Sequence, residues 1–186
     1  YKIDNAKEAY NDIQNKSPKP LLVLIKYDQA VKKIDKIVIN NQKKLNSDEK
    51  ISLSIAGTGS FAKGVHLPNI SLLNNIFHIN GIMSRSAHNA NSVMKQYGAS
   101  FCSTDYNEIL IDKNTDSVLI STRHDSHLEM TINALKAGKN VLVEKPLSLN
   151  KEGLDQIKDF YKKDPDIEKP ILMVGYNRRF APHITK

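Results

Sequence analysis

Two glycines and a small residue follow a short apolar run at a spacing that binds dinucleotides. The run from Ile51 to Ile55 leads to Gly57 and Gly59, and Ala62 comes three residues later. In such a turn the first glycine permits a tight bend, the second leaves room for a pyrophosphate, and the small residue lets helix and strand pack closely. N–H groups at the start of the helix then bind the phosphates. An ordinary turn can share this spacing, so the predicted strand and helix around it carry the interpretation.

The whole turn is the candidate pyrophosphate site. Its residues are Gly57, Thr58, Gly59, Ser60, Phe61 and Ala62. After the next apolar segment come Ser84 and Arg85, where folds that prefer NAD usually carry an Asp or Glu for the ribose 2′-hydroxyl. A hydroxyl and a guanidinium suit a 2′-phosphate instead, because arginine binds phosphate oxygens in bidentate fashion. The sequence therefore predicts NAD(P) and favours NADP, with a plain surface arginine as the alternative.

A third apolar segment ends in a polar stretch that contains two histidines. Its candidate cofactor contacts are Thr122, Arg123, His124 and His127. Two histidines three residues apart resemble a metal pair, but zinc sites need three or four ligands and no third ligand has suitable spacing. We therefore expect no metal. Thr122 to His124 are expected to line the nicotinamide side of a cleft, whereas His127 begins the next helix, where it caps or packs.

A fourth apolar segment, Val141 to Val143, leads directly into Glu144 and Lys145. A lysine beside apolar walls has its charged form disfavoured, and it can exchange a proton with a substrate hydroxyl. Lys145 is thus the candidate catalytic residue, with a surface ion pair as the alternative. After the last apolar segment, Arg178 is a candidate contact for the cofactor or for an oxygen-rich substrate, or part of a hinge.

These residues need a sheet that brings the ends of the apolar segments together. Strands are expected at 51–57, 76–83, 117–122, 141–144 and 171–175, and helices at 60–66, 88–97, 126–137 and 150–162, with a short helix at 105–110. The first helix should end before Pro68. Strands alternating with helices predict an α/β fold with a doubly wound parallel sheet, which binds ligands outside the carboxyl ends of its strands.

The segment before the glycine turn has a different character. Residues 4–15 predict an amphipathic helix and residues 21–25 a strand, while residues 28–49 are polar, with 34–39 undecided between helix and strand. We expect three parts: an extension and linker at 1–49, a dinucleotide-binding domain at 50–180, and the start of a further domain at 181–186.

The bulk composition narrows the classes of partner. The net charge is +7, but the basic residues are scattered and there is no Trp, which argues against a nucleic-acid site. One cysteine excludes an intrachain disulfide and fits a reducing compartment, so a cytoplasmic location is expected. We expect Cys102 to be buried. No apolar stretch approaches 18 residues and no signal peptide is visible, so no membrane contact is expected.

Three of these stretches together resemble the Gfo/Idh/MocA oxidoreductases. They are Gly57–Ala62, Ala137–Pro146 and Gly175–Phe180. The resemblance implies a nicotinamide dinucleotide cofactor, hydride exchange at a sugar or cyclitol carbon, and a catalytic role for Lys145. The family often has Pro-Asn where this chain has Arg123 and His124. It also implies a C-terminal α/β substrate domain, absent from these residues, on which oligomerisation would depend.

Two further interpretations remain. Residues 1–27 resemble the C-terminal tail of a medium-chain alcohol dehydrogenase, which would fit a slice of a two-part oxidoreductase, or they form a plain extension. The functional alternative to an enzyme is a non-catalytic module that senses a dinucleotide and regulates. Retention of Lys145 favours the enzyme.

Overall fold

The computed structural model describes residues 1–26, 38–40, 50–164 and 167–184. The chain divides into two compact units, residues 1–35 and residues 36–186. The predicted linker end at 46–48 and most of the undecided run 34–39 lie outside the described residues, but Val38–Asn40 forms a strand, β1.

The first unit contains the predicted helix but not the predicted strand. Helix α1 spans Ala6–Asn15 after a short 3-10 turn, Ile3–Asn5, and it buries Ala9. The expectation of a strand at 21–25 is wrong: these residues form no strand, and Leu21 is fully exposed. A strand needs a neighbour to accept its hydrogen bonds. Among the described residues of this unit, the pairing is limited to one bridge between Lys2 and Lys26.

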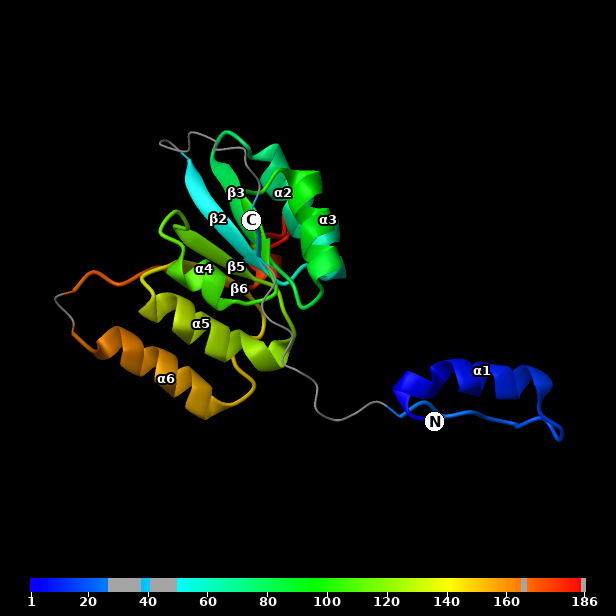
Figure 1. The fold of residues 1–186 in the computed structure, drawn as a ribbon. Coiled ribbons are helices and arrows are strands. Elements are labelled where there is room, and N and C mark those ends of the chain that lie inside the picture. Colours follow the sequence, from blue (N-terminus) through cyan, green and yellow to red (C-terminus); the bar gives the residue numbers. More distant parts are fainter. Residues whose placement is uncertain (27–37, 41–49, 165–166, 185–186) are drawn as a thin grey trace. The chain divides into compact units, whose positions relative to one another are not determined.

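The second unit is built on one sheet (Figure 1). Its strands are β1, β2 (Ile51–Ala56), β3 (Phe77–Met83), β4 (Phe101–Ser103), β5 (Ser117–Ile120), β6 (Asn140–Glu144) and β7 (Leu172–Gly175). The spatial order is β1-β4-β3-β2-β5-β6-β7, and every neighbouring pair is parallel except β1 with β4. From β4 to β7 this is the order of a doubly wound dinucleotide-binding sheet, so the predicted fold class is confirmed.

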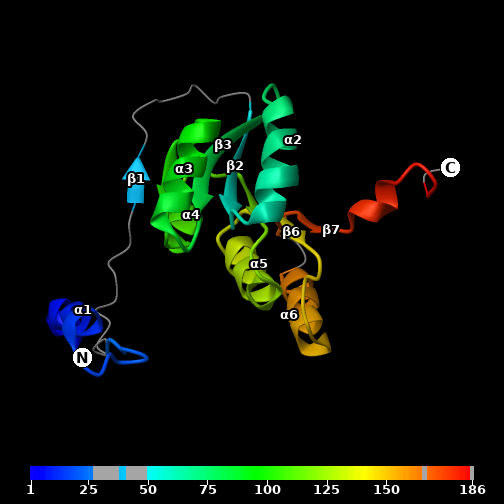
Figure 2. The same ribbon diagram turned by 90° about the vertical axis from the view of Figure 1, so that its right-hand side faces the viewer.

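Helices cover both faces of the sheet (Figures 1 and 2). The helical segments of this unit are η2 (Ala62–His66), α2 (Leu67–Leu72), α3 (Ala87–Tyr97), α4 (Asn107–Ile111), η3 (His124–Ser126), α5 (His127–Lys136), α6 (Lys151–Lys162) and η4 (Asn177–Phe180), and η4 buries no residue. Residues of α2 and α3 share one core cluster, and residues of α4, α5 and α6 share the other. Strand side chains alternate between the clusters: Leu119 joins the first, and Val118 and Ile120 join the second.

The five strands and the helices predicted after residue 50 are present with small shifts at their ends. Two details differ. The strand β4 was not predicted, because three residues are too short to show a period, although its Cys102 is buried as expected. The first helix does not end at Pro68 but continues to Leu72. It can do so because η2 is a π turn, in which Leu67 N–H donates to Ala62 O five residues back, immediately before the proline.

Candidate functional site

The glycine turn lies where the strand order reverses, between β2 and β5. Gly57 follows β2 with φ +96°, and its N–H donates to Met83 O on β3 at 2.9 Å. The Ser121 hydroxyl, after β5, donates to Gly57 O at 2.8 Å. A Cβ on Gly57 would lie 2.7 Å from Ser121 O. This position therefore requires glycine for both its backbone conformation and its close approach to the neighbouring strand.

Gly59 and Ala62 have the surroundings that a phosphate-binding turn needs. A Cβ on Gly59 would meet no protein atom within 4 Å, so the space above this glycine is open. Ala62 is fully buried at the start of η2, where a larger side chain would push the helix away from the sheet. Open space above the second glycine and a small buried third residue are the two features that a pyrophosphate-binding turn needs, and pyrophosphate binding here stays a prediction.

The larger cavity at this edge of the sheet has a volume of about 580 Å³, which is in the range of small-molecule sites. It connects the glycine turn, the end of β3 and the segment after β5. Its lining residues are Gly57, Thr58, Gly59, Met83, Ser84, Arg85, Ser86, Asn89, Ser121, Thr122, Arg123, Asp125, Ser126 and Met130. The predicted residues Ser84, Arg85, Thr122 and Arg123 are thus brought to one space with the glycines.

Asn89 is a lining residue that sequence reasoning missed. It lies in the first turn of α3, and its backbone N–H donates to the hydroxyl of Ser86, the N-cap. Its side-chain amide donates to Thr58 Oγ1 at 2.6 Å and to Ser84 Oγ at 3.1 Å. The available signal was a polar residue in the first turn of a helix that begins at the ligand edge, three positions beyond a good N-cap.

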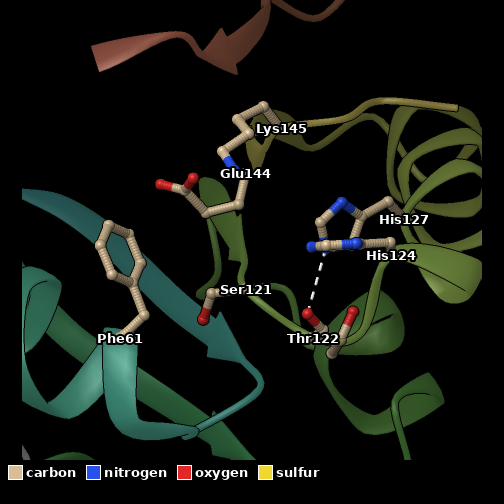
Figure 3. A pocket seen from close by; sticks show the side chains of 7 residues that line it. All are labelled: Phe61, Ser121, Thr122, His124, His127, Glu144 and Lys145. Atoms are coloured by element: carbon tan, nitrogen blue, oxygen red, sulfur yellow. Dashed lines mark hydrogen bonds between the residues drawn. The ribbon is translucent and has the colours of Figure 1, made fainter. Parts of the chain in front are cut away.

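A smaller cavity of about 170 Å³ lies at the end of β6 (Figure 3). Its lining residues are Phe61, Ser121, Thr122, His124, His127, Glu144 and Lys145. Figure 3 shows Phe61 on one side of this cavity, the two histidines on the other, and Lys145 at the end of its strand. Thr122 and Ser121 line both cavities, so the two spaces are neighbours. An ammonium group here can donate to a hydroxyl or carbonyl oxygen.

The carboxylate of Glu144 contacts His66, a second residue that sequence reasoning missed. His66 Nε2 lies 2.8 Å from Glu144 Oε1, and both side chains are largely buried, at 18% and 14% exposed. A Cβ on Gly175 would lie 3.0 Å from the same carboxylate oxygen, so glycine there leaves room for Glu144. The contact joins the helix after the glycine turn to the strand that carries Lys145.

His127 is fully buried and joins two backbone segments. Its Nδ1 lies 2.8 Å from Pro146 O, and its Nε2 lies 3.2 Å from Thr122 O. Carbonyl oxygens only accept, so each of these contacts needs the hydrogen on the ring nitrogen, and the contact with Pro146 O is the shorter one. The imidazole thereby ties the segment after Lys145 to the segment after β5.

Three predicted site residues do not line either cavity. Ser60 is exposed at the start of the helix, Ala62 is buried beneath the turn, and Arg178 is exposed in η4. Within the described residues, no group of three His, Cys, Asp or Glu side chains is arranged to hold a metal ion. Over the same part of the chain, no helix combines the length and the apolar character needed to cross a bilayer.

Comparison with known proteins agrees with this geometry. Residues 51–176 match the Gfo/Idh/MocA oxidoreductase family, which is described by its NAD-binding Rossmann fold. The chain is 33% identical over 130 residues to a 4-carboxy-2-hydroxymuconate-6-semialdehyde dehydrogenase from Sphingobium, covering 70% of this chain and 39% of that protein. It is 40% identical over 82 residues to a myo-inositol 2-dehydrogenase from Thermotoga maritima, covering 44% of this chain and 23% of the relative.

A solved structure gives the same picture. An NAD-binding protein from Listeria innocua superposes with a TM-score of 0.60 and 32% identity, over 70% of this chain and 36% of that one. In each of these comparisons the chain spans less than half the length of the protein it matches.

Proposed function

The chain belongs to the Gfo/Idh/MocA family of oxidoreductases, and from that premise we propose that it is the cofactor-binding half of an NAD(P)-dependent oxidoreductase. The observation that carries this proposal is the cavity at the reversal of strand order, bounded by Gly57, Thr58 and Gly59. The substrate that we propose is a sugar or cyclitol, oxidised or reduced at a hydroxyl-bearing carbon. The similarity to a myo-inositol 2-dehydrogenase supports that class.

The proposed roles follow the two cavities. The turn Gly57–Ala62 binds the pyrophosphate, and Ser84 and Arg85 bind the adenosine ribose. The nicotinamide end is bounded by Thr122, Arg123, His124, His127 and Glu144, with Arg178 as a further contact. The bound nicotinamide supplies or accepts the hydride. Lys145 holds the substrate hydroxyl and moves its proton during hydride transfer. An amine directly after β6 suits this role because it can donate and accept a proton.

NADP is the cofactor that we propose in preference to NAD. Ser84 and Arg85 line the cavity at the end of β3, where a carboxylate would favour the 2′-hydroxyl of NAD. Titration of the chain with NADPH and with NADH by calorimetry tests this preference. Tighter binding of NADPH is expected, and tighter binding of NADH would overturn the choice of cofactor without overturning dinucleotide binding.

The catalytic role of Lys145 is tested in the full-length protein. Lys145→Met should lower the rate of hydride transfer to a cyclitol such as myo-inositol by roughly 100-fold or more. Its dissociation constant for NADPH should stay within about two-fold, because the glycine turn is unchanged. A full-length variant that keeps its biological function without Lys145 would favour the dinucleotide-sensing module instead.

The remaining assignments are proposals of the same kind. Residues 50–180 form the dinucleotide-binding domain, 1–49 an extension, and 181–186 the start of the substrate domain, which would also carry the oligomer contacts. The family match at 51–176 supports the extent proposed for the dinucleotide-binding domain. Residues 1–27 would be the tail of an alcohol-dehydrogenase-like half, and α1 is the feature that supports it. The single cysteine supports a cytoplasmic location, and the scattered charge supports a protein that does not bind nucleic acid.

A further inference from the structure

The amide of Asn89 joins three parts of the larger cavity. Its nitrogen donates to both oxygens of Thr58, at 2.6 Å to the hydroxyl and 3.2 Å to the carbonyl, and to Ser84 Oγ at 3.1 Å. Thr58 belongs to the glycine turn, and Ser84 follows β3. Both are buried, at 4% and 8% exposed, so Asn89 bonds to fixed groups rather than to mobile surface side chains.

The oxygen of the same amide accepts a hydrogen bond from the ammonium group of Lys63 in η2. This arrangement has one orientation only, because an ammonium cannot accept a hydrogen bond and the oxygen must therefore face it. The amide thus holds a cation from η2 at its oxygen and Ser84, at the end of β3, at its nitrogen. Lys63 is exposed and does not itself line the cavity, but its partner Asn89 does, so the ammonium group lies next to a lining residue with N–H groups to spare.

The charged side chains around the larger cavity indicate why a cation at Lys63 would matter for a bound phosphate. Within the described part of the chain, no carboxylate forms an ion pair with Lys63. Among the charged side chains, Arg85 and Arg123 line the cavity, and Asp125 lines it from the segment after β5. A phosphomonoester carries about −1.5 to −2 charges near neutral pH, more than one arginine balances. A second cation, here linked to Ser84 through the Asn89 amide, is therefore what a 2′-phosphate would require and what a 2′-hydroxyl would not.

We propose that Lys63 is a specificity-determining residue that binds the 2′-phosphate of NADP(H) together with Ser84 and Arg85, and that Asn89 positions its ammonium group. This inference rests on the proposed function, since it assumes a nicotinamide dinucleotide in the larger cavity. The pyrophosphate is the other phosphate that Lys63 could reach, and it is common to both cofactors. The two cases differ in whether the loss of Lys63 affects one cofactor or both.

The test measures the dissociation constants of NADPH and NADH for the chain and for its Lys63→Met variant by calorimetry. The variant should bind NADPH about ten-fold more weakly, the effect of one charge-assisted hydrogen bond, and NADH within about two-fold. Lys63→Arg should keep most of the preference because it keeps a cation. Lys95→Met, which removes an exposed charge from the last turn of α3, is the matched control and should change neither constant.

The role of Asn89 is tested by the same comparison of the dissociation constants for NADPH and NADH. Asn89→Asp turns the positioning amide into a carboxylate that pairs with Lys63, so NADPH binding should fall relative to NADH. Equal losses for both cofactors in Lys63→Met would assign Lys63 to the pyrophosphate and overturn the proposal, as would no loss for either. If the unmodified chain binds neither cofactor, the proposed function itself fails, and this inference fails with it.

Discussion

Adding one methyl group at each of the two glycines of the turn should have opposite consequences. In Gly57→Ala the new Cβ would lie 2.7 Å from Ser121 O and 2.8 Å from Thr122 N, both backbone atoms, at a φ of +96°. The left-handed backbone costs about 1–2 kcal/mol for a non-glycine residue, and overpacking costs about 1–3 kcal/mol. The free energy of unfolding should therefore fall by about 2–5 kcal/mol, a large part of the stability of a typical domain.

In Gly59→Ala the same methyl group would meet no protein atom within 4 Å. The free energy of unfolding should change by less than about 0.5 kcal/mol, as for an exposed site without special features. The methyl group would instead occupy the space proposed for the pyrophosphate, so the dissociation constant for NADPH should rise by roughly ten-fold or more. The expectation is thus that Gly57 supports stability, whereas Gly59 supports cofactor binding.

Urea unfolding followed by circular dichroism measures the first quantity, and calorimetric titration of NADPH measures the second. The reasoning would be refuted if Gly59→Ala lost more than about 2 kcal/mol, or if Gly57→Ala were as stable as the parent chain. Full NADPH affinity in a folded Gly59→Ala would show that no phosphate lies above the turn.

Two further outcomes follow from the geometry. Asn150 caps α6 by accepting from Gly153 N–H at 2.9 Å, so Asn150→Ala should cost about 1 kcal/mol and lower the Tm by about 2–4 °C, whereas Asn150→Asp should restore most of the loss. Burial, reinforced by the charge of Lys50, lowers the pKa of His78. The unfolded state then binds its proton more readily, so the unfolding free energy should fall as pH drops below about 6.5, the usual histidine value. His78→Gln should flatten that part of the urea-midpoint profile between about pH 7.5 and 5.5, and an unchanged slope would contradict the assignment.

The parts of the fold that could be predicted are those in which one segment carries its own pattern. Strands β2 and β3 each follow a turn or linker, bury most of their side chains and lead into a helix, which makes them visible in the sequence. Strand β4 has three residues and no pattern of its own, and its pairing with β3 and with β1 makes it a strand. The apolar run 21–25 has the composition of a strand but forms none, because apolar content does not supply a partner strand.

The residues of the candidate site also fall into those that the sequence could predict and those that it could not. Residues directly after a strand, such as Ser84, Thr122 and Lys145, were found because a parallel sheet brings all such positions to one edge. The lining residue Asn89, the Glu144 partner His66 and the proposed cation Lys63 were missed because they lie within helices. Their contacts with one another and with strand ends depend on how those helices pack on the sheet, and no local spacing encodes that packing.

The buried ring of His127 supports the main chain around the smaller cavity through hydrogen bonds to backbone oxygens. Both of its partners are backbone carbonyls, those of Thr122 and Pro146, and every residue type carries such a carbonyl. Exchange of the side chain at position 122 would leave the acceptor in place, as would exchange of Lys145 beside the other acceptor. The surface facing a ligand can therefore change residue by residue, with new hydroxyls, rings or charges, while the path of the main chain beneath it stays the same.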